Sequence, residues 1–272
     1  MSSLTTLSSD QLAQRIRSLA LKMVHQAKAS HIGSALSITD IVAVLFADVL
    51  HFDPADPEAA ERDRLILSKG HACTAIYAAL AEAGFFGVDC LAGYGKDHSI
   101  FMTHISHKVP GVEFSTGSLG HGLPFGVGKA LAAGRMGANW KTFVILSDGE
   151  LDEGSNWEAF LFASHHHLDH LVAIIDYNKL QSLTTVDATL QLEPLSDKLR
   201  AFGWSVREVD GHSHSLLRES LAATPWEPAK PSVLIARTTK GKGVSFMENQ
   251  VEWHYRSPSD VLLDQALSEV RG

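Results

Sequence analysis

Two apolar segments, each followed at once by polar residues, constrain the fold more than any other part of this sequence. The first segment, residues 142–146, leads into 147–150, and the second, residues 171–175, leads into 176–180. Both have the length and unbroken hydrophobicity of strands that are buried on both faces of a parallel sheet. The residues between them, about 152–169, predict a crossover helix, so the whole stretch predicts one βαβ unit.

The polar residues that follow these strands predict a binding site. Parallel strands joined by a crossover end at the same edge of the sheet, where ligands bind. The side-chain oxygens of Asp148 and Asn178 are therefore expected to converge on one hard cation, with a backbone carbonyl such as that of Leu180 as a third ligand. Gly149 lets a phosphate approach the backbone closely. Alone, Asp148-Gly149 is an ordinary turn dipeptide, and the spacing to Asn178 is what indicates a magnesium diphosphate site.

Helical and strand-like segments alternate along the whole chain, which predicts an α/β fold with a mostly parallel sheet and helices on both faces. The expected strands are 64–68, 142–146, 171–175, 204–209 and 232–236. The expected helices are 9–29, 37–50, 72–83, 120–134, 152–169, 213–222 and 259–270. No linker, repeat or low-complexity tract divides the 272 residues, so a single domain over 1–272 is expected.

Composition narrows the functional classes. The net charge of −8 without a basic cluster argues against binding to nucleic acid or to an anionic membrane surface. The apolar run 41–50 is too short to span a bilayer and contains Asp48, so it predicts a buried helix. Cys73 and Cys90 suggest neither a disulfide framework nor a zinc site, and a reducing cytoplasm is expected.

Four of the fifteen histidines lie in segments that are expected to form loops. They are His31, His71, His104 and His254. A loop histidine near a strand end can shuttle protons or contact an anion, although each one singly is more often structural. The three consecutive histidines at 165–167 point in different directions on a helix, so a solvated helix end is expected there rather than a metal site.

Two glycine-rich segments are candidates for ligand contact. Residues 115–122 precede the Gly- and Ala-rich helix, and such a turn can bring the backbone against a flat or anionic ligand. Residues 239–243 contain two lysines between glycines, which can form an anion loop but more often form an exposed turn. Glu153 and Glu158 diverge on the crossover helix, so both are expected on a solvated face.

Taken together, these segments resemble the N-terminal, diphosphate-binding part of transketolases, from about residue 15 to residue 258. Residues 30–33 resemble the family's Ser-Gly-His-Pro-Gly, and 67–71 resemble its Leu-Ser-x-Gly-His. Residues 110–122 resemble Pro-Gly-Val-Glu-x-x-Thr-Gly-x-Leu-Gly-x-Gly. Residues 147–154 resemble Gly-Asp-Gly-x-x-x-Glu-Gly, which Asn178 completes. The departures are Ile32 for proline, Ser147 for glycine, and Thr103-His104-Ile105 for Gly-His-Pro.

The resemblance implies a thiamine diphosphate-binding fold and a role for each matching residue. Magnesium would be held by Asp148, Asn178 and the carbonyl of Leu180. The residues that would contact thiamine diphosphate are His71, Gly117, Leu119, Gly149, Asn178 and His254. The catalytic residues would be His31, His104 and His254, which surround the sugar, and Glu153, which would lie at a subunit interface.

The resemblance also implies an activity and a partner. The activity would be transfer of a two-carbon ketol unit from a ketose phosphate to an aldose phosphate. The chain ends at Gly272, before the family's pyrimidine-binding and C-terminal domains, so a second chain is expected to supply them in an α2β2 heterotetramer. Two alternatives remain open: the α subunit of a 2-oxo acid dehydrogenase, and a non-catalytic subunit that retains the fold. The sequence does not identify the sugar.

Overall fold

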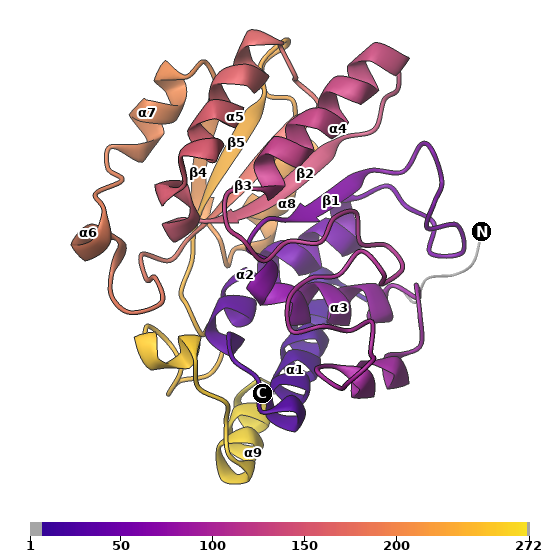
Figure 1. The fold of residues 1–272 in the computed structure, drawn as a ribbon, viewed down its shortest axis with the longest axis vertical. Helices are drawn as coiled ribbons and strands as arrows, with labels where there is room; N and C mark the ends of the chain where they lie inside the picture. The colour runs from indigo at the N-terminus through magenta and orange to yellow at the C-terminus, as the bar shows by residue number, and fades with distance from the viewer. Residues whose placement is uncertain (1–6, 271–272) are drawn as a thin grey trace.

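The computed structural model describes residues 7–270 of the domain expected over 1–272. Five parallel strands form one sheet in the order β1-β2-β3-β5-β4 (Figure 1). The strands are β1 (Arg64–Leu67), β2 (Thr142–Ser147), β3 (Leu171–Tyr177), β4 (Ser205–Asp210) and β5 (Ser232–Arg237). The predicted α/β class and parallel sheet are confirmed, and helix α5 connects β2 to β3 as the βαβ prediction requires.

Helices cover both faces of the sheet. They are α1 (Ser9–Ala27), α2 (Ile32–Val44), α3 (Cys73–Glu82), α4 (Gly122–Met136), α5 (Gly154–His165), α6 (Val186–Thr189), α7 (Leu195–Ala201), α8 (His214–Ala222) and α9 (Asp260–Glu269). Figure 1 shows α4 and α5 side by side over the sheet, with α1 to α3 on the opposite side and α9 next to α1.

Alternate residues of the central strands point to the two helical layers. Phe143 and Ile145 of β2 pack in the core that includes α1, α2, α3 and α8. Val144 and Leu146 pack in the second core, with α4, α5 and α7. Because both faces are covered, β2 and β3 are apolar almost throughout, as strands of a parallel sheet must be. Gly126 lets α4 approach closely, since a Cβ there would lie 2.5 Å from Val144.

Helix α2 and the π-helical turn that follows it, Leu45–Val49, run through the centre of the α1–α3 layer. Together, Ile32–Val49 are 18 residues, long and apolar enough by length and composition to cross a membrane, but 78% of this segment is buried inside the protein. It is therefore a core helix of this fold, which agrees with the buried helix expected at 41–50.

The structure differs from the expected elements in two places. Helix α2 begins at Ile32 rather than at residue 37, because His31 takes a left-handed conformation (φ 75°) that starts the helix there. Helices α6 and α7 lie in a segment for which no helix was predicted. Both are only one or two turns long, too short to show helical periodicity in the sequence.

Candidate active site

One cavity of about 250 Å³ lies at the edge of the sheet where the strands end. Its walls are His31, Ser34, Lys69, His71, His104, Gly117, Leu119, Ser147, Asp148, Gly149, Asn178, Leu180, Gln181, Ser182, Lys240, His254 and Tyr255. Every residue that the sequence proposed for the metal or the cofactor is in this set, together with the three proposed catalytic histidines. Segments more than 200 residues apart therefore meet here through the fold.

The carboxylate of Asp148 is fixed by backbone amides at the end of β2. Its Oδ1 accepts a hydrogen bond from the N–H of Gly149 at 2.7 Å, and its Oδ2 accepts one from the N–H of Lys179 at 2.5 Å. Lys179 makes this contact from a left-handed conformation (φ 66°), which turns the chain back after β3. Burial, and then the nearby charge of Asp176, raise the pKa of Asp148 to about 7. A buried carboxylate of this kind is stabilised by an added cation.

Asn178 and Leu180 line the same cavity. The Oδ1 of Asn178 accepts one hydrogen bond, from the N–H of Leu180 at 3.0 Å, which leaves its second lone pair free of protein donors. The carbonyl of Leu180 lies 3.2 Å from Nζ of Lys240. Within residues 7–270, no group of three or more His, Cys, Asp or Glu is placed to hold a metal. A cation here would depend on amide and carbonyl oxygens beside Asp148.

The four loop histidines form one cluster. The ring of His31 lies 5.1 Å from that of His71, 5.6 Å from that of His104 and 5.0 Å from that of His254, between ring centres. The N–H of His31 donates to the carbonyl of His254 at 2.7 Å, which joins two segments that are far apart in the sequence. The loop histidines are thus one site rather than four separate structural residues.

Two buried lysines in the cavity wall were not predicted from the sequence. Lys69 and Lys240 are each 1% exposed. Nζ of Lys240 donates to the carbonyl of Gln181 at 2.9 Å and contacts Nδ1 of His254 at 3.0 Å. The expected exposed turn at 239–243 was therefore wrong for Lys240. Its position in the sequence could have indicated this, because Lys240 lies shortly after the end of β5, at the same edge of the sheet as Asp148 after β2.

Two lysines and four histidines lie close together in this cavity, so the protonated forms of Lys240 and of the histidines are raised in free energy. Burial first, and then the charge of Lys69, lower the pKa of Lys240 to about 8. Burial and neighbouring cationic groups lower the pKa of His31 to about 4 and that of His254 to about 3. Burial also lowers the pKa of His71 and of His104. The imidazoles are therefore neutral near pH 7, and an anion that entered would relieve the repulsion.

Glu153 does not line the cavity. It is exposed just before α5, beside Gly120, where a Cβ on the glycine would lie 2.7 Å from that of Glu153. The structure agrees with the expected solvated face for Glu153 and Glu158. Glu150, a buried glutamate to which the sequence assigned no role, connects the loop after β2 to the loops that contain Ser68 and Gly120. It accepts from the N–H of Gly120 at 2.8 Å and from the hydroxyl of Ser68.

The cavity thus has two chemically distinct parts. Asp148, Asn178 and the Leu180 carbonyl present oxygens of the kind that hard divalent cations prefer. Lys69 and Lys240 supply positive charge that attracts a polyanion, and the neutral histidines offer hydrogen-bond donors to it. Gly117 lies in the wall beside His104, whose ring would be in van der Waals contact with an added Cβ, 3.7 Å away. A cation-bound diphosphate with a flat organic group suits this arrangement.

Comparison with known proteins places this chain in a family. Residues 8–260 match the family described as "Transketolase, thiamine diphosphate binding domain". The chain is 39% identical over 258 residues to an apulose-4-phosphate transketolase subunit of Phocaeicola vulgatus, covering 95% of this chain and 92% of that one. It is 38% identical to the 6-deoxy-6-sulfo-D-fructose transketolase subunit SqwG of a Clostridium species, covering 95% and 94%.

Solved structures give the same result. A transketolase from Campylobacter jejuni superposes with a TM-score of 0.91 at 29% sequence identity, covering 97% of this chain and 42% of the other. A transketolase from Leishmania mexicana gives a TM-score of 0.88 at 28% identity, covering 97% and 45%. The chain therefore spans less than half the length of these solved relatives.

Proposed function

Because this chain belongs to the transketolase family, through its thiamine diphosphate-binding domain, we propose that it binds thiamine diphosphate with Mg²⁺ and supplies this part of a site for ketol transfer. The donor would be a ketose phosphate and the acceptor an aldose phosphate. The observation that carries the proposal is the meeting of Asp148, Asn178 and Leu180 with two buried lysines in one cavity. The family match favours this activity over the 2-oxo acid dehydrogenase alternative. The presence of the complete metal and histidine set argues against a non-catalytic role.

Magnesium would be held by the carboxylate of Asp148, the Oδ1 of Asn178 and the carbonyl of Leu180. The residues fit the ion because Asp148 is buried with its pKa raised to about 7, an unfavourable state that a divalent cation removes. The three protein oxygens leave positions for phosphate oxygens and water, which Mg²⁺ usually retains.

The diphosphate would be bound by Lys69, Lys240, His71 and the backbone at Gly149. Gly117 and the backbone of Leu119 would face the aminopyrimidine. When bound, thiamine diphosphate supplies an electron sink for the two-carbon fragment. The protein positions the reactants and limits access of water to them.

His31, His104 and His254 would contact the sugar hydroxyls and move protons. Their lowered pKa values keep the rings neutral, so each ring has one nitrogen that donates and one that accepts. For His254, Nδ1 accepts from the ammonium of Lys240, which assigns the ring proton to Nε2. That nitrogen is the hydrogen-bond donor of His254.

We further propose that a second chain completes the site in an α2β2 assembly. One observation supports a partner: relatives of similar length are named as subunits of transketolases. An apolar groove between α4 and α5, lined by Pro124, Val127, Leu131 and Phe162, lies beside Gly120 and offers a surface for it. Glu153 is exposed next to this groove. The two free cysteines agree with the cytoplasmic location that we propose.

Assay of the isolated chain and of the chain with its partner tests the proposal. The partner would be isolated by co-purification, and both samples would be given thiamine diphosphate, Mg²⁺ and a panel of ketose and aldose phosphates. The panel includes branched and sulfonated sugars, because relatives carry those names. We expect transfer only by the combined chains. Activity of this chain alone would refute the two-chain proposal, and inactivity of the complex on every sugar would refute ketol transfer.

A further inference from the structure

The carboxylate of Asp176 contacts Asn178, a proposed metal ligand, but Asp176 is not among the residues that line the cavity. We infer that Asp176 is a positioning residue that, together with the hydroxyl of Ser37, fixes the carboxamide of Asn178 with its oxygen toward the magnesium site. This inference rests on the proposed function, because it assigns a purpose to Asp176 only if Asn178 binds the metal. The group itself touches neither metal nor substrate.

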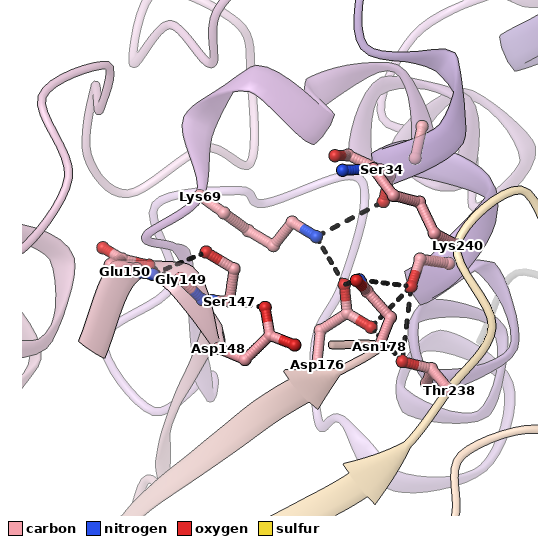
Figure 2. A network of polar contacts seen from close by, with 12 residues as sticks. Ser34, Lys69, Ser147, Asp148, Gly149, Glu150, Asp176, Asn178, Thr238 and Lys240 are labelled. Atoms are coloured by element: carbon pink, nitrogen blue, oxygen red, sulfur yellow. Dashed lines mark hydrogen bonds and ion pairs between the residues drawn. The ribbon is translucent and has the colours of Figure 1, made fainter. Parts of the chain in front are cut away.

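Four hydrogen-bond donors meet the two oxygens of Asp176, which is fully buried at the end of β3 (Figure 2). Its Oδ2 accepts from Nζ of Lys69 at 2.5 Å and from Nδ2 of Asn178 at 3.1 Å. Its Oδ1 accepts from the hydroxyl of Ser37 at 2.6 Å and from the hydroxyl of Thr238. Burial alone would raise the pKa of Asp176, but Lys69 and these hydrogen bonds lower it below its usual value. The group is an ionised acceptor.

This arrangement determines which end of the Asn178 amide faces the cavity. The Nδ2 of Asn178 donates to Asp176 and, at 3.1 Å, to the hydroxyl oxygen of Ser37. Ser37 has only one hydroxyl proton and gives it to Asp176, so it can only accept from Asn178. The oxygen of Asn178 accepts the N–H of Leu180 on the other side. Rotation of the amide by 180° would place its NH2 group against the N–H of Leu180 and its oxygen against the oxygens of Asp176 and Ser37.

An uncharged residue at position 176 would lose this control. In Asp176→Asn, an NH2 group replaces one carboxylate oxygen and cannot accept from the two donors there, which are Lys69 and Asn178 at Oδ2 or Ser37 and Thr238 at Oδ1. The amide of Asn178 could then present its NH2 group to the cation in part of the molecules. Residues that orient metal ligands in this way typically change metal affinity by about 10- to 100-fold when they are substituted.

Ser37 and Thr238 offer a matched pair of substitutions. Both hydroxyls donate to Oδ1 of Asp176, but only that of Ser37 also contacts Asn178. Ser37→Ala and Thr238→Val therefore remove the same support from Asp176, and they differ only at the metal ligand. If Asp176 and Ser37 act on the orientation of Asn178, the two variants will differ in Mg²⁺ dependence. A merely structural network would give them equal effects.

The experiment measures the Mg²⁺ concentration that half-saturates binding of thiamine diphosphate, by quenching of tryptophan fluorescence or by near-UV circular dichroism. The complete complex is used, and thermal unfolding in EDTA confirms that each variant is folded. We expect half-saturation to rise about tenfold or more in Ser37→Ala and Asp176→Asn, and less than about threefold in Thr238→Val. The Ser37 and Thr238 pair decides the question even if Asp176→Asn does not fold.

Two outcomes would overturn the inference and are distinguishable from each other. Equal half-saturation in Ser37→Ala and Thr238→Val, with wild type binding normally, would refute the joint positioning of Asn178 by Asp176 and Ser37 and leave the proposed function intact. Absence of Mg²⁺-dependent thiamine diphosphate binding in the wild type would refute the proposed function, and this inference with it.

Discussion

Replacing Asp148 by asparagine tests the buried charge on which the proposed magnesium site depends. The substitution preserves shape but removes a carboxylate that is 1% exposed. Burial and Asp176 raise its pKa from 3.8 to about 7 in the absence of metal. At about 1.36 kcal/mol per pKa unit, the ionised group costs the metal-free fold on the order of 4 kcal/mol at high pH.

The pH dependence of this cost has a definite sign. The pKa of Asp148 is higher in the folded than in the unfolded state, so the cost is absent below pH about 4, grows as the pH rises, and is complete above pH about 7. Asp148 accepts hydrogen bonds from the backbone N–H groups of Gly149 and Lys179, and asparagine at this position could accept only one of them. The loss of the other costs roughly 1–3 kcal/mol. The net expectation is a stabilisation of Asp148→Asn by on the order of 2 kcal/mol at pH about 8. That corresponds to roughly 5 °C in Tm.

Thermal unfolding at pH about 5 and about 8 measures this effect, first in EDTA and then with saturating Mg²⁺ and thiamine diphosphate. In EDTA, the Tm of Asp148→Asn should exceed that of wild type more at the higher pH. With the ligands, wild type should gain Tm by mass action, and the variant should gain little. Asp197→Asn, at an exposed site, controls for loss of one negative charge.

Two results would refute the reasoning, each at a different step. A lower Tm of the variant in EDTA at high pH would mean that Asp148 is not an unfavourable buried charge. An undiminished gain on adding the ligands would mean that it does not hold the metal.

Other substitutions test separate parts of the site. Lys240→Met should weaken thiamine diphosphate binding about tenfold or more in titration calorimetry, because it removes a buried cation from the proposed diphosphate site; unchanged affinity would exclude this contact. Between pH 7 and pH 5 the metal-free protein should lose on the order of 1–2 kcal/mol of stability for each of His31 and His254, since their lowered pKa values oppose protonation in the folded state; denaturant titrations of their glutamine variants should show a smaller loss. Phe162→Glu should weaken association with the partner chain in sedimentation without lowering Tm by more than a few degrees, because the ring is 43% exposed; undiminished association would exclude the α4–α5 groove. Gly70→Ala should destabilise the fold strongly in thermal unfolding, since its Cβ would lie 2.3 Å from the Thr116 carbonyl oxygen; a Tm like that of wild type would show that the loop yields freely.

Most of the strands and helices could be predicted from the sequence because local hydrophobic patterns determine them. The unbroken apolar segments predicted β2 and β3, and polar residues directly after them predicted where Asp148 and Asn178 would lie. The Gly- and Ala-rich run predicted a closely packed helix, and α4 does pack closely on β2. The short helices α6 and α7 and the early start of α2 were missed, because too few residues define them.

The loop residues of the site were only partly predictable. Single histidines and lysines carry no periodic signal, and a Gly-Lys-Gly segment has the same composition whether it is exposed or buried. Lys240 is buried because carbonyls from the loop after β3 and the ring of His254 surround its ammonium group. Those partners are distant in sequence, so no local pattern contains them.

The sequence by itself determined the order of the strands and of the longer helices, the edge of the sheet where the cavity lies, and the positions of Asp148 and Asn178 there, because strand and helix periods are local properties of the chain. The tertiary structure alone decided that His31 meets His254, that Lys240 is buried, and that Asp176 lies behind Asn178 with Lys69 and Ser37 around it. These contacts join segments far apart in sequence, and the burial that shifts their pKa values exists only when the whole sheet and its helices are assembled.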